Sequence, residues 1–299
     1  METILKRIGL GLAGLVGLLV VAAGLVFFLS EARMNKRYTV PEETVPIVSD
    51  AETLARGEHL ATIRGCTDCH SANLGGSVFI EDPALGRIVA SNLTSGRGGI
   101  GGAYGDEDWV RAIRHGVGPD GKPLLFMPSN EFYYLSDDDL GALIAYLKQV
   151  SPVDNEPPQS SVGPLGRVLF LAGQLPLLPA ERIDHEAPRP PAPRAGVTVE
   201  YGQYLATGCV GCHMENFAGG PIPGMPPGTP PAANLTPAGH LSEWTEADFI
   251  TAMRTGVRPN GERISEVMPF QSIGAMTDEE LKAVWLFLQS LPPVEAEAG

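Results

Sequence analysis

Cysteine and basic side chains are both scarce in this sequence of 299 residues. Four cysteines are too few for a fold held together by disulfides. The 21 lysines and arginines are outnumbered by 35 aspartates and glutamates, which gives a net charge of −14. Such an acidic surface repels phosphate backbones, so nucleic acid is excluded as a partner and basic proteins are favoured. Hydrophobic residues make up 43% of the chain, which excludes a wholly disordered polymer.

One long apolar run lies near the N-terminus. Residues 8–29 contain no charge, and at 1.5 Å per residue these 22 residues span a hydrocarbon core of about 30 Å. A cleaved secretory signal has a shorter apolar core, of about 7–15 residues, followed by small residues. Because Phe27 and Phe28 stand where the small residues would be, the run predicts an uncleaved membrane helix. Basic residues on both sides of the run leave its orientation open.

The rest of the chain contains an internal repeat with an offset of 140 to 143 residues. The matched segments are Cys66–His70 with Cys209–His213, Asn92–Thr94 with Asn234–Thr236, Arg114–Val117 with Arg254–Val257, Met127-Pro128 with Met268-Pro269, and Leu135–Leu140 with Met276–Leu281. Their order is the same in both halves, so the chain carries a duplicated module. We expect an anchor over residues 1–37, a first domain over 38–154, a proline-rich linker over 155–197 and a second domain over 198–299.

Helical patterns open and close each module. Ser136 and Thr277 are predicted N-caps of the closing helices, and apolar residues then recur with helical spacing. Helical patches are also expected at 106–114 and 245–254. The opening and closing helices are expected to cross closely, with Gly57 against Tyr146 and Gly202 against Phe287. The apolar linker segments 168–172 and 175–178 are expected to lie across both modules and be covered by them.

All four cysteines lie in two Cys-x-x-Cys-His strings, which are Cys66, Cys69 and His70 in the first module and Cys209, Cys212 and His213 in the second. Two thiols on one helical turn can add to the two vinyl groups of a haem, while the adjacent imidazole binds the iron. By chance, only ~0.001 such strings are expected in this composition. A zinc site would need both pairs to converge and ignore the histidines, and a redox dithiol would need a βαβ context. The strings therefore predict two covalently bound haem c groups.

A second axial ligand is suggested by two methionines at matched positions. Met127 lies 57 residues after His70, Met268 lies 55 residues after His213, and a proline follows each methionine. A thioether ligand raises the reduction potential and suits electron transfer. Met225 is the competing ligand for the second iron, although the first module has no counterpart of it.

The remaining polar candidates have weaker signals. We expect the other four histidines, His59, His115, His185 and His240, to be solvated or hydrogen-bonded, with ligation by two histidines as the alternative. Arg114 and Arg254 occupy equal repeat positions. Pairing with haem propionates and exposure at the surface are equally good interpretations of these two arginines.

In their order and spacing, these motifs resemble the class I cytochrome c modules. More narrowly, they are similar to the cytochrome c subunits of bacterial membrane-bound alcohol, aldehyde and gluconate dehydrogenases. The resemblance covers residues 54–154 and 199–294 and implies an all-α fold with two tandem haem domains. It also implies axial pairs His70/Met127 and His213/Met268, with Cys66, Cys69, Cys209 and Cys212 as thioether anchors. Those subunits typically carry three haem modules, whereas this chain has two.

Two functions remain open at this point. The first is a membrane-anchored dihaem electron carrier, either free-standing or a subunit of a larger complex. Its expected partners are a dehydrogenase, a quinol-oxidising complex, a soluble cytochrome or an oxidase. The second is a dihaem peroxidase, in which one iron keeps or opens a substrate position. The resemblance places residues 38–299 on the periplasmic or extracytoplasmic side of the bacterial inner membrane.

Overall fold

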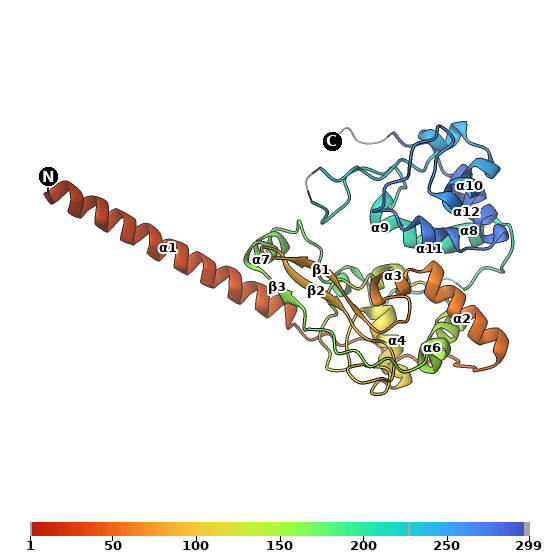
Figure 1. Cartoon of the computed structure of the whole chain (residues 1–299), viewed down its shortest axis with the longest axis horizontal. Helices are drawn as coiled ribbons and strands as arrows, with labels where there is room; N and C mark the ends of the chain where they lie inside the picture. The colour runs from red at the N-terminus through yellow and green to blue at the C-terminus, as the bar shows by residue number, and fades with distance from the viewer. Residues whose placement is uncertain (1, 190, 227, 296–299) are drawn as a thin grey trace.

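The fold is that of a computed structural model, which describes residues 2–189, 191–226 and 228–295 (Figure 1). The outermost ends of the predicted anchor and second domain, and Pro190 of the predicted linker, lie outside these residues. The predicted apolar helix is α1 (Glu2–Met34), which extends beyond residues 8–29 at both ends. Its most apolar 18-residue window has a mean hydropathy of 2.7 and is not buried by the rest of the chain. By length and composition, α1 is able to cross a membrane.

The two modules repeat the same helical plan. The first contains α2 (Ala51–Ile63), α3 (Cys66–His70), α4 (Asp106–His115), α5 (Ser129–Phe132) and α6 (Asp137–Gln149). The second contains α8 (Val199–Leu205), η2 (Ala206–Cys209), α9 (Val210–His213), η3 (His240–Glu243), α10 (Glu246–Thr255), α11 (Phe270–Gly274) and α12 (Asp278–Ser290). The expected helical patches at 106–114 and 245–254 are confirmed as α4 and α10.

The predicted N-caps are confirmed at both closing helices. The Ser136 hydroxyl accepts a hydrogen bond from the backbone N–H of Asp139 at the start of α6, at 3.1 Å. Thr277 caps α12 in the same way, and the Glu280 carboxylate accepts a hydrogen bond from the Thr277 backbone N–H at 2.9 Å. These contacts satisfy N–H groups that have no partner within the helix.

Glycine permits the close crossing of the opening and closing helices, as predicted. A Cβ atom added at Gly57 would lie 2.7 Å from the Cβ of Tyr146, and one added at Gly202 would lie 2.8 Å from the Cβ of Phe287. Neither separation is possible for real carbon atoms, so α2 packs on α6, and α8 on α12, only because these positions lack side chains. Both crossings lie within one hydrophobic cluster that continues from the first module into the second.

A small antiparallel sheet adds to the predicted all-helical plan. It consists of β1 (Ser77–Asp82), β2 (Gly86–Ala90) and β3 (Ser161–Val162), in that spatial order. The turn between β1 and β2 is closed by Asp82, whose carboxylate accepts from the backbone N–H groups of Ala84 and Leu85 at 2.8 Å each. These short strands were not predicted, because glycine-rich segments on both sides of them are typical of loops. The third strand comes from the linker, and local sequence patterns carry no signal for such a pairing.

The apolar part of the linker is covered only in part, mainly by the first domain and the end of α1, because Val168 is 47% exposed. The linker contains α7 (Pro164–Leu171) and η1 (Pro179–Arg182). Its buried side chains form a separate cluster with the sheet, comprising Ile88, Phe170, Leu175, Leu177 and Leu178. The expectation that this stretch lies across both modules is therefore only partly right. Of its apolar residues, Leu175 and Pro176 lie near Gly224 of the second module.

Ion pairs attach the C-terminal end of α1 to the linker. The Arg167 guanidinium donates to the Ser30 hydroxyl at 2.7 Å and to the Glu31 carboxylate at 2.9 Å. In a second ion pair the basic residue comes from the helix and the acidic one from the linker: Arg33 pairs with Glu181 at 2.6 Å. The C-terminal end of α1 is thus fastened to the linker, and the rest of the helix projects away from the folded domain (Figure 1).

Candidate haem sites

Each Cys-x-x-Cys-His string forms a short helical turn whose histidine is held by a backbone carbonyl. The Nδ1 atom of His70 lies 2.6 Å from the Ser91 carbonyl oxygen, and that of His213 lies 2.7 Å from the Ala233 carbonyl oxygen. A carbonyl oxygen only accepts, so Nδ1 carries the hydrogen and Nε2 keeps its lone pair. Burial lowers the pKa of both histidines, which favours the neutral form. A neutral imidazole with a fixed tautomer is the form that binds iron.

The four cysteines remain unpaired with one another and are half-buried. Burial raises the pKa of the Cys66 and Cys209 thiols to about 12 each, and that of Cys69 to about 11. Before haem attachment, these thiols are therefore protonated at neutral pH. Within the described ranges, no group of three or more His, Cys, Asp or Glu side chains has a metal-binding arrangement, so the geometry lends no support to the zinc alternative.

The repeated Asn-Leu-Thr strings hold the loops that supply these carbonyls. In the first module, the Asn92 Oδ1 accepts from the Thr94 N–H at 2.9 Å and from its hydroxyl at 2.8 Å, while the Asn92 Nδ2 donates to the Val153 carbonyl at 2.7 Å. Asn234, Thr236 and Val294 repeat all three contacts in the second module, at 2.9, 2.8 and 2.7 Å. From the sequence, these strings were identified only as part of the repeat. Their recurrence at matched positions was the one signal that could have indicated a positioning role.

The methionines differ in burial. Met127 and Met268 are half-buried and pack, like Cys66 and Cys209, against the shared hydrophobic cluster. Met225 is instead 38% exposed. The geometry therefore favours Met268 over Met225 as the residue equivalent to Met127.

A buried tryptophan in the first domain has a hydrogen-bond donor that a haem could satisfy. Trp109 is 2% exposed, and its Nε1–H finds no acceptor among the described residues. A buried N–H without an acceptor is costly, so such a group normally has a partner. A haem carboxylate is an acceptor of the required kind, and the residues present therefore fit the group.

Arg114 and Arg254 have protein partners. Arg114 is 1% exposed and donates to the Leu135 carbonyl at 2.8 Å and to Asp137 at 2.9 Å. Arg254 donates to the Gly274 carbonyl and, at 2.8 Å, to Asp278. Both arginines thus fasten the start of a closing helix. Arg114 is therefore not a surface residue, while its buried Nε has no acceptor among the described residues, so pairing with a haem propionate stays a prediction.

The oriented turns and the repeated helical plan define a haem-binding electron-transfer protein of the c type. The family pattern described as Cytochrome c matches residues 54–151 and 199–292, and the chain belongs to that family. Haem c is therefore its cofactor, and its role is electron transfer rather than catalysis on a substrate.

Known relatives fall into two groups. The chain is 29% identical to the alcohol dehydrogenase (quinone) cytochrome c subunit of Gluconacetobacter polyoxogenes, over 84% of this chain and 58% of that protein. It is 26% identical to the fructose dehydrogenase cytochrome subunit of Gluconobacter japonicus, over 87% and 56%. It is also 26% identical to a diheme cytochrome c-type protein of Cereibacter sphaeroides, over 84% and 93%. The chain thus spans less than two thirds of the dehydrogenase subunits but most of the diheme protein. None of these three is named as a peroxidase.

The other histidines are hydrogen-bonded or exposed, as expected. His59 lies 2.7 Å from Glu280, and His240 is exposed. His115 is completely buried, with its Nδ1 3.0 Å from the Nδ1 of His185 and its Nε2 3.4 Å from Glu43. Burial lowers the pKa of His115 to about 4, because it outweighs the attraction of the Glu43 carboxylate.

This burial predicts a pH-dependent stability of the first domain. The pKa of His115 is lower in the folded protein than its ordinary value of 6.5, so its contribution is fully present above pH 6.5 and is lost as the pH falls towards 4. We expect the melting temperature to decrease over this range and His115→Gln to remove part of the decrease. Circular dichroism melts at several pH values would measure it. The exposed His240→Gln is the control, and a profile that His115→Gln leaves unchanged would contradict the prediction.

Proposed function

We propose that this chain is a membrane-anchored dihaem cytochrome c that transfers electrons between a donor and an acceptor at the membrane surface. The observation that carries the proposal is the duplicated Cys-x-x-Cys-His turn with its histidine fixed by a carbonyl in both modules. In each turn the two thiols would hold one haem by thioether bonds. The attachment residues are Cys66 and Cys69 in the first domain and Cys209 and Cys212 in the second.

The axial ligands proposed are His70 with Met127 and His213 with Met268. When bound, haem supplies a one-electron Fe(III)/Fe(II) couple. The chain supplies a fixed imidazole, a thioether that raises the potential, and an apolar shell that limits access of water. The half-burial of both methionines and the exposure of Met225 support this ligand set.

We further propose that α1 anchors the chain in the bacterial inner membrane, with the haem domains on the periplasmic side. The apolar length of α1 supports the anchor, and the compartment in which cytochromes c receive haem supports the side. The proposed segments remain 1–37, 38–154, 155–197 and 198–299. The pairing of β3 with β2 adds the start of the linker to the first domain as a structural unit.

Partners of the chain are proposed by analogy with its relatives. Two of them are named as cytochrome subunits of an alcohol and a fructose dehydrogenase, which supports a role as a dehydrogenase subunit. The diheme cytochrome of similar length supports a two-haem carrier without a third module. The net charge of −14 favours docking to a basic surface. A quinol-oxidising complex, a soluble cytochrome or an oxidase is the proposed partner on the other side of the transfer.

The haem count gives a direct test. The reduced pyridine adduct of the purified protein is expected to show two haem c groups per chain, and the intact mass should exceed that of the polypeptide by two haems. Changing Cys209 and Cys212 to serine should remove one of the two. A colourless protein, or one with the mass of bare polypeptide, would refute the proposed function.

Replacing the proposed methionine ligands separately tests their roles. We expect Met127→Leu and Met268→Leu each to abolish the methionine-to-iron absorption band of one haem and to lower the potential of that haem alone. Met225→Leu is the matched control and should leave spectrum and potentials unchanged. Redox titration with optical detection measures both quantities. Peroxide turnover that rises when either ligand is removed would instead favour an enzyme with an opened site.

The anchor is tested by exchanging it. With residues 1–29 replaced by a cleavable secretory signal, we expect the coloured protein to move from the membrane fraction to the soluble fraction, because the apolar run is gone. The intact chain should require detergent for extraction. Retention of the exchanged chain in washed membranes would show that another surface holds it there.

A further inference from the structure

The two domains meet where each Cys-x-x-Cys-His turn contacts the short helix that follows the other domain's methionine. In one half of this interface, the Ser272 hydroxyl on α11 donates to the carboxylate of Asp68, inside the first turn, at 2.7 Å. In the other half, the Glu131 side chain on α5 lies directly against Gly211, inside the second turn. Asp68 and Gly211 are equivalent positions of the repeat, as are Ser272 and Glu131. The interface therefore has approximate two-fold symmetry, with one acidic side chain in each half.

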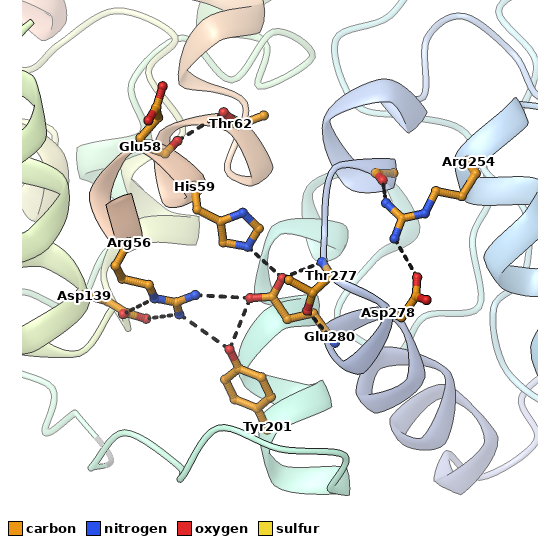
Figure 2. A network of polar contacts seen from close by, with 11 residues as sticks. Arg56, Glu58, His59, Thr62, Asp139, Tyr201, Arg254, Thr277, Asp278 and Glu280 are labelled. Atoms are coloured by element: carbon orange, nitrogen blue, oxygen red, sulfur yellow. Dashed lines mark hydrogen bonds and ion pairs between the residues drawn. The ribbon is translucent and has the colours of Figure 1, made fainter. Parts of the chain in front are cut away.

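The contacts between helices follow the same symmetry, and Figure 2 shows the half around Glu280. His59 on α2 reaches Glu280 of the second domain at 2.7 Å, while Tyr204 on α8 donates to Asp139 of the first domain at 2.7 Å. Glu280 and Asp139 are both the third residue of a closing helix. Arg56 joins the two halves, since its guanidinium lies 3.0 Å from Asp139 and 3.1 Å from Glu280. Each domain thus presents a carboxylate that a side chain of the other domain binds.

Arg64 lies between the two haem-attachment turns. It is 9% exposed, and its guanidinium donates to the Leu205 carbonyl at 3.0 Å and to the Thr207 hydroxyl at 3.1 Å, two residues before Cys209. A Cβ atom added at Gly208, next to Cys209, would lie 3.8 Å from Nη1 of Arg64. The guanidinium of Arg64, two residues before Cys66, thus lies beside the second turn at the domain interface.

We infer that the two domains exchange electrons directly across this interface, and that Arg56, His59 and Glu280 are positioning residues that hold the two haem-attachment turns against each other. The inference rests on the proposed function, with one haem attached to each turn. The step moves a single electron: one domain is oxidised as the other is reduced, and no atom is transferred. Docking by buried side chains keeps the turns at one separation, which an unrestrained linker would not do.

The charge on Glu280 is central to this arrangement. Its side chain is only 6% exposed, and burial alone would raise its pKa, but the contacts with His59, the Thr277 N–H and Arg56 lower the pKa to about 2. It is therefore ionised at neutral pH. Removing that charge leaves Arg56 and His59 with a weaker acceptor in a largely buried setting, which favours separation of the domains.

Glu280→Gln and Asp278→Asn form a matched pair of variants on α12. Glutamine at position 280 keeps the ability to cap the helix, so the change removes the charge with little effect on α12 itself. Asp278 binds Arg254 within the second domain and takes no part in the interface (Figure 2). We expect Glu280→Gln to increase hydrogen exchange in α5 and α11 by about tenfold or more and to slow interdomain electron exchange after pulsed reduction. Asp278→Asn should change neither, and the potential of each haem should stay as in the parent protein.

A second pair of variants gives the Gly211–Glu131 half of the interface the residues of the Asp68–Ser272 half. A Cβ atom added at position 211 would overlap the Glu131 carboxyl group, so Gly211→Asp should open the domains. Adding Glu131→Ser should close them again, because the second half would then copy the Asp68–Ser272 hydrogen bond. Both substitutions introduce the residue that the repeat already carries at the equivalent position, so each domain should still fold and attach haem.

The outcomes separate this inference from the proposed function. Loss of haem in the parent protein would refute the proposed function, whereas hydrogen exchange tests the docking without reference to haem. Equal effects of Glu280→Gln and Asp278→Asn, or failure of Glu131→Ser to rescue Gly211→Asp, would overturn the positioning role. Separated domains with an unaltered rate of electron exchange would overturn the direct route. If Glu280→Gln does not fold, Gly211→Asp with and without Glu131→Ser tests whether the domains are docked in this way.

Discussion

The hydrogen bond between each histidine Nδ1 and a backbone carbonyl fixes the imidazole ring, and the rest of each domain positions the two partners of that bond. That bond requires a loop at a fixed distance from the Cys-x-x-Cys-His turn, and the Asn-x-Thr contacts hold this loop to the chain just after the closing helix. The closing helix is in turn placed by its crossing at a glycine of the opening helix, which leads into the turn. In each domain, the loop, the closing helix and the opening helix thus together position the imidazole ring. A displacement of any of these three segments would rotate the ring.

Both domains share these contacts around the histidine and differ elsewhere. Among the described residues, the first domain also has the sheet, the linker cluster and the contact of the buried His115 with the half-buried His185. In the second domain, the corresponding region between His213 and Asn234 has an isolated bridge of Gly220 with Ala232 and no strand among its described residues. The shared parts are those that hold the turn and the closing helix, including the arginine that binds the helix start. The additions in the first domain lie next to α1 and the linker.

Features with local signals were predictable from the sequence. Ser136 and Thr277 were identifiable as caps because a helix start needs side-chain acceptors within three residues. The haem-attachment strings were identifiable because their chemistry requires a fixed spacing. The sheet and the domain interface were not predictable, since β2 pairs with a strand about 75 residues away and Asp68 meets a serine 204 residues away. Nothing in the neighbourhood of His115 signalled burial, because its partners Glu43 and His185 come from distant segments.

The attachment of α1 to the linker through Arg167 and Arg33 has a consequence for encounters between molecules. A chain held in a bilayer by α1 would not swing on a flexible stalk, because the end of the helix is part of the folded body. Its search for a redox partner would then be a two-dimensional one, by lateral diffusion and by rotation about the membrane normal. A productive encounter would require a partner whose docking face projects to the same height above the lipid.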